Sequence, residues 1–227
     1  MRPFQTVFLV LCLFATMSMA GDLQPMSTTE GGESITADRD AVFCQQPDFW
    51  GMLASQIDLV YPFEAGAIDD FTPDYDVPIS AIQWWGVYWN ANPDLGPVEY
   101  FVISVFEDDG QCYPVEEPFY QEEIHLFTEV GVDENTFEYN AEIPIAQLNA
   151  GQAYWLEIQA VMLYDPAGQW GWATSDMVNW CAPLQGFPAL EIPFWSETES
   201  ASLAFCLYSE VTGVEAQSWS QVKSLFR

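Results

Sequence analysis

The sequence predicts an all-β protein, an antiparallel β-sandwich of jelly-roll or Greek-key type with about eight to ten strands. Three observations support this prediction. Runs rich in β-branched and aromatic residues recur along the chain and are separated by Pro, Gly, Asn and Asp. Several runs alternate apolar and polar residues, as strands with one solvated face do. No long segment of the body, residues 41–210, shows the 3.6-residue period of an amphipathic helix.

The expected strands follow one another through this body. They cover residues 56–63, 78–89, 98–107, 120–130, 135–145, 153–164, 168–174 and 201–210. The stretch LNAGQAYW places Leu148 six residues before Tyr154, across a glycine and just before a strand. This spacing is similar to the tyrosine corner of Greek-key sandwiches, in which the tyrosine hydroxyl bonds to backbone at the start of a strand.

The two ends of the chain differ in composition from the body. Residues 1–20 have a basic residue, a short apolar run and a Ser-Met-Ala ending, which predicts a cleaved signal peptide and an exported protein. The polar residues 21–40 predict a disordered leader. In the tail, residues 211–227, Trp219, Val222 and Phe226 have the spacing of a short helix. The tail resembles C-terminal sorting segments of exported bacterial proteins; the alternatives are a frayed end or a helix docked on its own domain.

Four cysteines remain after the expected signal cleavage: Cys44, Cys112, Cys181 and Cys206. An even number in an exported chain predicts two disulfides, and three pairings are open. We favour Cys44–Cys206, because the ends of a domain often lie close together, with Cys112–Cys181 as the second bridge. The alternatives are free buried thiols or a zinc site, but the sequence has no paired CxxC spacing.

The charge balance excludes two classes of partner. The chain has 34 acidic residues, 4 Lys or Arg and a formal net charge of -30, and no Lys or Arg lies between Asp40 and Val222. Nothing in the body therefore neutralises the phosphates of nucleic acid. Anionic membrane surfaces are excluded for the same reason. No run of the body is long and apolar enough to span a membrane.

The stretch IQWWGVYW, residues 82–89, is apolar or aromatic on both faces of a strand. A tryptophan-rich core explains one face, and we expect Trp84 and Tyr88 to point into it. The other face carries Trp85 and Trp89 beside Gln83. These three residues, with the neighbouring pair Trp170 and Trp172, form a candidate saccharide platform. The alternative is that all these rings are covered by packing.

Acidic pairs suggest a second kind of site. Asp69 and Asp70, with Asp108 and Asp109, offer the oxygen ligands that Ca²⁺ prefers, although no EF-hand spacing is present. The alternative for the second pair is a hairpin turn completed by Gly110. Nucleophilic catalysis is not supported, because His125 is the only histidine and no nucleophile elbow or HExxH motif occurs.

The order of several motifs supports a resemblance. DDFTPDYDVPISAIQWWGVYW, FVISVFEDDGQCYP, AGQAYWLEIQA, GQWGW and LAFCLYSE follow one another between residues 55 and 210. Together they resemble uncharacterised secreted bacterial β-sandwich domains that are jelly-roll-like and similar in outline to carbohydrate-binding modules. The resemblance implies an exported β-sandwich and brings no catalytic residue with it.

These observations predict a secreted, non-catalytic module at the cell surface or outside the cell. We expect it to bind a saccharide or another cell-surface polymer, as a glycan-binding or adhesive protein. A purely structural surface or matrix protein is the alternative. An acidic glycosidase, which needs only two suitably spaced carboxylates, is the third interpretation.

Overall fold

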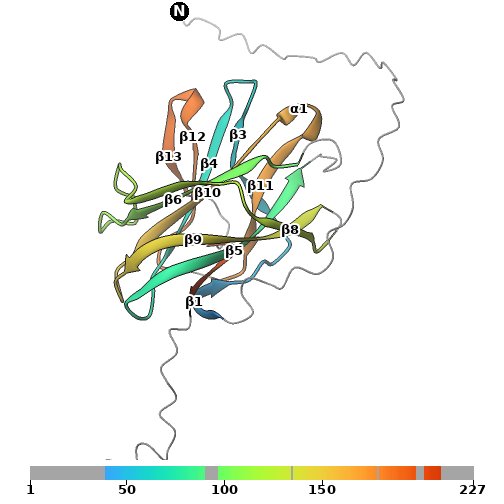
Figure 1. Ribbon diagram of the computed structural model, residues 1–227. Helices are drawn as coiled ribbons and strands as arrows, with labels where there is room; N and C mark the ends of the chain where they lie inside the picture. Colours follow the sequence, from blue (N-terminus) through green and yellow to red (C-terminus); the bar gives the residue numbers. More distant parts are fainter. Residues whose placement is uncertain (1–38, 90–96, 134, 178, 198–201, 211–227) are drawn as a thin grey trace, which may run out of the picture. The chain divides into compact units, whose positions relative to one another are not determined.

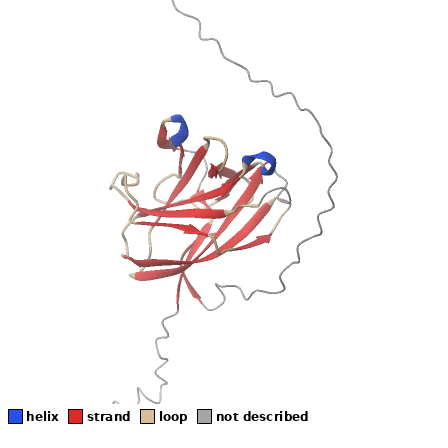
Figure 2. Cartoon of the chain, turned by 45° about the horizontal axis from the view of Figure 1, so that its top comes forward, coloured by secondary structure: helices blue, strands red, loops and turns tan. Residues whose placement is uncertain are grey.

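The structure, a computed structural model, describes residues 39–89, 97–133, 135–177, 179–197 and 202–210. The expected signal peptide, most of the expected leader and the expected C-terminal helix lie outside the described residues. The described chain forms two β-sheets packed face to face, with little helix (Figures 1 and 2). The prediction of a β-sandwich is confirmed. No helix in the described ranges is long and apolar enough to cross a membrane.

Sheet I contains eight of the described strands. They are β1 (Arg39–Gln45), β2 (Met52–Ala54), β5 (Val77–Trp89), β8 (Thr128–Gly131), β9 (Thr136–Leu148), β11 (Gln169–Ser175), β14 (Ser202–Leu203) and β15 (Phe205–Glu210). The long strand β5 is its centre, because it pairs with β9, β11 and β15. All the pairings of this sheet are antiparallel.

Sheet II contains the other seven strands. They are β3 (Gln56–Asp58), β4 (Glu64–Phe71), β6 (Tyr100–Glu107), β7 (Tyr120–Ile124), β10 (Tyr154–Met162), β12 (Leu184–Phe187) and β13 (Ile192–Glu197). The strand order is β13-β12-β4-β3-β10-β6-β7, and β4 also pairs with β10. β3 pairs with β10 in parallel, which is the one departure from an antiparallel arrangement among the described strands. A four-residue helix, α1 (Tyr164–Ala167), and a 3-10 turn, η2 (Pro188–Leu190), complete the fold.

Aromatic rings fill the space between the sheets. From β5, Trp84 and Tyr88 point inward and are fully buried, as the sequence predicts. Trp84 stacks on Tyr139 of β9, with ring centroids 5.4 Å apart, and meets Phe101 of β6 edge-on at 4.9 Å. Rings from both sheets therefore interlock across the core.

A hydrogen bond from backbone to a tyrosine fixes one corner of the sandwich. The N–H of Asn149 donates to the hydroxyl of Tyr154 at 3.0 Å, and Leu148 is fully buried beside this turn. Gly151 of the same turn has a φ of 71°, a conformation that glycine adopts without strain. The expected tyrosine corner at the start of β10 is confirmed.

Both expected disulfides are confirmed. Cys44 and Cys206 are direct partners on the neighbouring strands β1 and β15 and form one bridge. Cys112 and Cys181, from two segments outside the strands, form the other. The first bridge joins the beginning and the end of the domain. It was expected because the ends of a domain often lie close together.

The strand boundaries differ from the prediction in several places. Fifteen strands are described rather than eight to ten: β1, β2, β4, β12 and β13 were not expected, and the expected runs 120–130 and 201–210 each form two strands. β1 begins at Arg39, two residues inside the expected leader, and Arg39 is held there by backbone pairing with Glu210. The expected strand over residues 120–130 is two strands: the chain leaves sheet II at Ile124 and enters sheet I at Thr128.

Candidate functional site

An aromatic groove opens on the outer face of sheet I, near the C-terminal end of β5. Its volume is about 470 Å³. We call it the aromatic groove, and its lining residues are Phe49, Trp50, Gly51, Met52, Val87, Trp89, Thr136 and Ala173. They come from the segment between β1 and β2, from β2 itself, and from the outward face of β5, β9 and β11.

Three aromatic rings around this groove are exposed to solvent. Trp50 is 91% exposed, and Phe49 and Trp89 are each 55% exposed. Single exposed apolar side chains are common, whereas several aromatic rings around one groove are characteristic of a binding surface. Thr136 is the one hydroxyl-bearing residue of the lining.

The loop that carries Trp50 is held firmly against sheet I. Asp48 Oδ1 accepts hydrogen bonds from the N–H of Trp50 at 2.8 Å and from the hydroxyl of Thr174 at 2.7 Å. Backbone bonds add to these, from Asp48 N–H to Thr174 O and from Thr174 N–H to Gly51 O, each at 3.0 Å. Phe49 has a φ of 59°, which is uncommon for a bulky residue and requires such support. The exposed rings are therefore positioned by the backbone.

The floor of the groove depends on a close approach between β2 and β11. Gly171 faces the outer side of β11, and a Cβ atom there would lie 2.5 Å from the sulfur of Met52 and 3.0 Å from the carbonyl of Leu53. A larger residue at this position would push β2 away. Glycine therefore allows Met52 to form one wall of the groove.

The predicted platform residue Trp89 lies in this groove, but Trp85 does not line it. Trp85 points to the outer face, as expected, yet it is only 4% exposed. It packs with Ala173, Ala204 and the Cys44–Cys206 bridge. The expectation of an open Trp85 ring is wrong, because small residues on neighbouring strands and the disulfide allow close packing on this face.

Gln83, the polar residue expected beside the platform, is engaged within the protein. Its Oε1 accepts a hydrogen bond from the hydroxyl of Tyr208 at 2.8 Å. Gln83 lies on the same outer face as Trp85 but does not line the aromatic groove. The structure therefore assigns it to the surface of β5 next to β15, away from the exposed rings.

Trp170 and Trp172 belong to the core, so their assignment to a platform is wrong. Both are fully buried. Trp170 fits against Gly86, where a Cβ atom would lie 2.2 Å from the indole ring. Trp172 donates its indole N–H to the carbonyl of Ala204 at 2.9 Å. The two rings share one face of β11, as residues two apart in a strand do, and that face is the inner one.

The carboxyl groups of Asp69 and Asp70 are buried on opposite faces of β4. Asp69 lies between the sheets and accepts hydrogen bonds from Gln45 Nε2 and from the N–H of Leu203, both at 2.7 Å. Burial raises the pKa of Asp69 from 3.8 to about 8, so the group is largely uncharged at neutral pH. Burial also raises the pKa of Asp70, to about 6.

Asp108 and Asp109 form the expected turn rather than a calcium site. Asp108 Oδ1 and Asp109 Oδ1 accept bonds from the N–H groups of Gly110 and Gln111, each at 2.7 Å. The second oxygen of Asp108 accepts the indole N–H of Trp155 at 2.8 Å. Within the described residues, no group of three Asp, Glu, His or Cys side chains is placed to hold a metal. The structure therefore does not bring the four aspartates of the candidate calcium site together, because Asp69 and Asp70 lie on opposite faces of β4.

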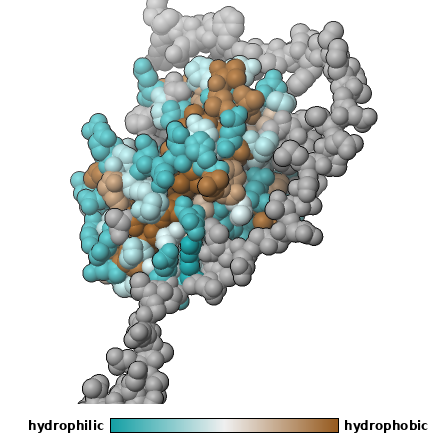
Figure 3. Space-filling view, in the orientation of Figure 1, coloured by the Kyte–Doolittle hydropathy of each residue, from teal (hydrophilic) through white to brown (hydrophobic). Residues whose placement is uncertain are grey.

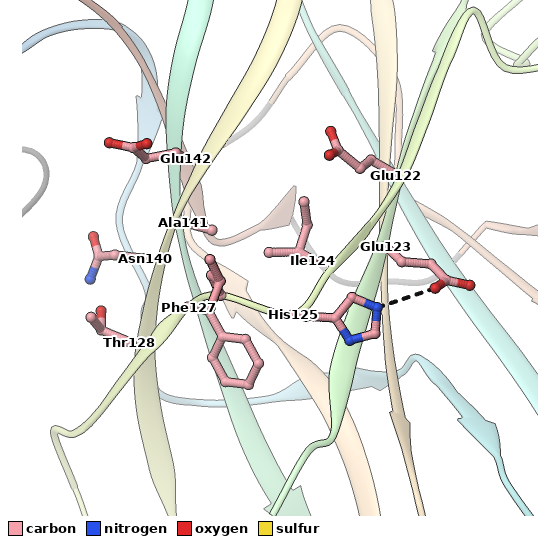
Figure 4. Close-up of a pocket in the computed structure, with 10 residues that line it drawn as sticks. Glu122, Glu123, Ile124, His125, Phe127, Thr128, Asn140, Ala141 and Glu142 are labelled. Carbon is pink, nitrogen blue, oxygen red and sulfur yellow. Dashed lines mark hydrogen bonds and ion pairs between the residues drawn. The ribbon is translucent and has the colours of Figure 1, made fainter.

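A second groove lies where the chain crosses between the sheets (Figure 4). We call it the edge groove; its volume is about 610 Å³, and its lining residues are Glu122, Glu123, Ile124, His125, Leu126, Phe127, Thr128, Asn140, Ala141 and Glu142. His125 contacts Glu123, with 3.2 Å between His Nε2 and Glu Oε2, and its ring lies 4.6 Å from that of Tyr100. No nucleophile is aligned with this histidine among the described contacts.

Phe49 and Trp50 are the site residues that the sequence analysis missed. They lie in QQPDFWG, a turn-like segment before the first strand that was expected. Adjacent aromatic residues within a Pro-Asp…Gly turn do not alternate into a core as strand residues do. Their presence in such a turn is the sequence signal for an exposed aromatic surface. Their proximity to Trp89 depends on the pairing of β2 with β11, and local sequence patterns do not predict that pairing.

Comparison with known proteins adds one finding. Residues 113–207 match the family model described as Domain of unknown function (DUF7901). This range contains Thr136 and Ala173 of the aromatic groove, whereas Phe49, Trp50 and Trp89 precede it. No curated protein and no solved structure matches the chain. The chain is therefore similar, over residues 113–207, to a domain whose function is unknown.

Proposed function

We propose that this chain is an extracellular, non-catalytic module that binds a neutral or cationic saccharide in the aromatic groove. The observation that carries the proposal is the set of three exposed rings, Phe49, Trp50 and Trp89, around one groove. The faces of aromatic rings pack against the CH groups of sugars, and a groove with few polar groups suits a ligand that binds mainly by stacking.

Two further features support this proposal. Two disulfides suit an oxidising compartment outside the cytosol. The net charge of -30 repels uronic acids and sulfated glycans, which limits the ligand to neutral or positively charged sugars. The hydrogen bonds of Asp48 hold Trp50 in place before a ligand arrives, so binding orders little additional chain.

A panel of neutral, amino-substituted and acidic polysaccharides tests the proposal in pull-down and calorimetry experiments. We expect Trp50→Ala and Trp89→Ala each to weaken binding about tenfold, because each removes one stacking contact. The matched control is Trp180→Ala, which removes a ring that is 88% exposed in the segment after β11. Binding that is equal in all three variants, or no binding by the parent protein, would leave a purely structural surface role as the better interpretation.

A further inference from the structure

Part of β9 has a free edge. β8 pairs with β9 only from Thr128↔Asn140 to Gly131↔Phe137. From Ala141 onward, β5 is the only partner of β9 among the described strands. Residues Ala141–Leu148 therefore present backbone N–H and C=O groups without a strand partner on one side, which is the arrangement that accepts an added strand.

The edge groove lies beside the start of this free edge. Figure 4 shows Glu122, Glu123 and His125 on one side of it and Asn140 and Glu142 of β9 on the other. Between them lie apolar side chains, those of Ile124, Phe127 and Ala141. Ile124 and Ala141 belong to the buried core, and Phe127 packs against it, so this floor is fixed. An extended segment that lies in the groove would contact the edge and the floor together.

The groove is acidic. The side chains of Glu123 and Glu142 are 62% and 73% exposed, and Glu122 also lines the groove. The basic groups described close to them are His125, 3.2 Å from Glu123, and Arg39, 3.1 Å from Glu142. No Lys or Arg follows Arg39 before Lys223. A cationic ligand is therefore favoured on both sides of the groove.

One buried polar group in the groove lacks a donor. Asn140 lines the groove and is only 6% exposed. Its Nδ2 donates to Glu138 Oε1 at 3.1 Å, whereas its Oδ1 accepts no hydrogen bond within the described part of the chain. Figure 4 shows this side chain pointing away from Ala141 and the apolar floor, so Asn140 contributes to the groove through its position at the start of the free edge and not through its amide.

We propose that the edge groove binds an extended, Lys- or Arg-containing peptide, which adds as a strand to the free edge of β9. The main chain of the peptide pairs with β9 from Ala141 to Ile143. Its basic side chains lie between the carboxylates of Glu122, Glu123 and Glu142. Pro144 has no N–H, so it limits how far the added strand can pair along β9. This site is separate from the aromatic groove, and neither proposal depends on the other.

A peptide of alternating lysine and valine is the probe for the first test, with the full-length protein. We expect the variant that carries Glu122→Gln and Glu123→Gln to bind this peptide about tenfold more weakly than the parent. The matched control carries Glu116→Gln and Glu117→Gln, which make the same charge change at two exposed residues outside the groove. An equal loss of affinity in both variants would mean attraction to the net charge alone and would overturn the proposal.

Backbone pairing is tested with the same peptide carrying N-methyl groups on alternate residues. This analogue keeps the charges and side chains but loses N–H donors along one edge. The two registers of N-methylation are compared. We expect the register that blocks the N–H groups facing β9 to weaken binding about tenfold. Hydrogen exchange should slow at residues 141–143 when the unmodified peptide is bound. Equal binding of both methylated peptides, or unchanged exchange at these residues, would overturn the strand-addition geometry.

Discussion

On the outer face of sheet I, Trp85 packs beside the Cys44–Cys206 bridge; on the outer face of sheet II, Trp155 packs near Cys112–Cys181. The two bridges have different geometry. The first joins neighbouring strands of one sheet, so it adds nothing above the face. The second joins two segments outside the strands, and these segments pack over the face.

This difference decides which face remains open. In sheet II, Cys112 and Val115 pack on a cluster that includes Phe106 and Trp155, and Trp155 is fully buried. In sheet I, the packing around Trp85 ends at Val87, and the face continues into the exposed rings of the aromatic groove. Figure 3 shows one view of the molecule, in which hydrophobic patches lie between hydrophilic side chains. In this protein the disulfide within sheet I leaves part of the outer face exposed, whereas the disulfide between two covering segments helps to bury the outer face of sheet II.

The loss of Trp155, like the loss of a disulfide, is among the largest expected effects. Trp155→Ala should lower the free energy of unfolding by roughly 3–5 kcal/mol, because it leaves a cavity under the loops and removes the partner of Asp108. Urea unfolding measures this. Trp180→Ala, in the exposed part of the same region, is the control and should change stability little. A small loss at Trp155 would mean that the face of sheet II is not covered as described.

Removal of each disulfide distinguishes the two faces further. The bridges span 162 and 69 residues, so the chain-entropy relation predicts a loss of about 4–5 kcal/mol for either. Only the double variant Cys112→Ser, Cys181→Ser should also expose Trp155, seen as stronger quenching of native tryptophan fluorescence by acrylamide. Equal quenching in the Cys44→Ser, Cys206→Ser variant would contradict the difference between the faces.

The pH dependence of stability tests whether the covered face of sheet II excludes water as the core does, because one carboxyl group is buried in each place. Burial raises the pKa of Asp69, between the sheets, and of Glu157, on the outer side of β10, to about 8 each. The folded protein therefore holds protons that the unfolded chain has lost. The contribution of these two groups to the free energy of unfolding is therefore most favourable below about pH 4. It falls as the pH rises toward 8, by on the order of a few kcal/mol.

Asp69→Asn and Glu157→Gln should each reduce this decrease in stability between pH 5 and pH 8, measured by denaturant unfolding at both values. If Glu157→Gln leaves the pH dependence unchanged while Asp69→Asn reduces it, then water reaches the outer face of sheet II. The two faces would then be more alike than the packing around Trp155 indicates.

The smallest expected effect lies at the open end of sheet I. Trp89→Ala should change the free energy of unfolding by no more than about 0.5 kcal/mol, because the ring is half exposed and contacts the core little. Trp85→Ala, four residues earlier on the same face, should cost roughly 3 kcal/mol, because its ring is covered. Similar losses at the two positions would mean that the boundary between packing and binding surface has been misplaced.

Much of the fold follows from local sequence patterns. The alternation in IQWWGVYW correctly identifies Trp84 and Tyr88 as core residues, and the spacing of Leu148 and Tyr154 identifies a corner. Strand β4 was missed because EAGAIDDF has a glycine and two aspartates, which are poor strand formers. Its stability depends on distant donors, such as the N–H of Leu203 for Asp69, and no local pattern contains them.

The candidate site was predictable only in part. Alternation identifies the face on which Trp85 and Trp89 lie, but not what covers that face. Trp85 is covered because it packs against Ala173 of β11, Cys206 of β15 and Ala204 between β14 and β15, whereas Trp89 is not covered. The positions of Phe49 and Trp50 beside Trp89 depend on the long-range pairing of β2 with β11. Such contacts become visible only when the strands are assembled.

The pairing of β1 with β15 determines how the domain responds to a pulling force. Arg39 and Glu210 are opposite each other where the two strands meet the rest of the chain, and Cys44 and Cys206 are opposite each other further in. Tension applied through both flanking segments would separate this pair from its open end, one hydrogen-bonded step at a time. The covalent bridge would stop the separation after a few residues. The remaining strands would carry no tension, so the sandwich and the aromatic groove would keep their shape under strain.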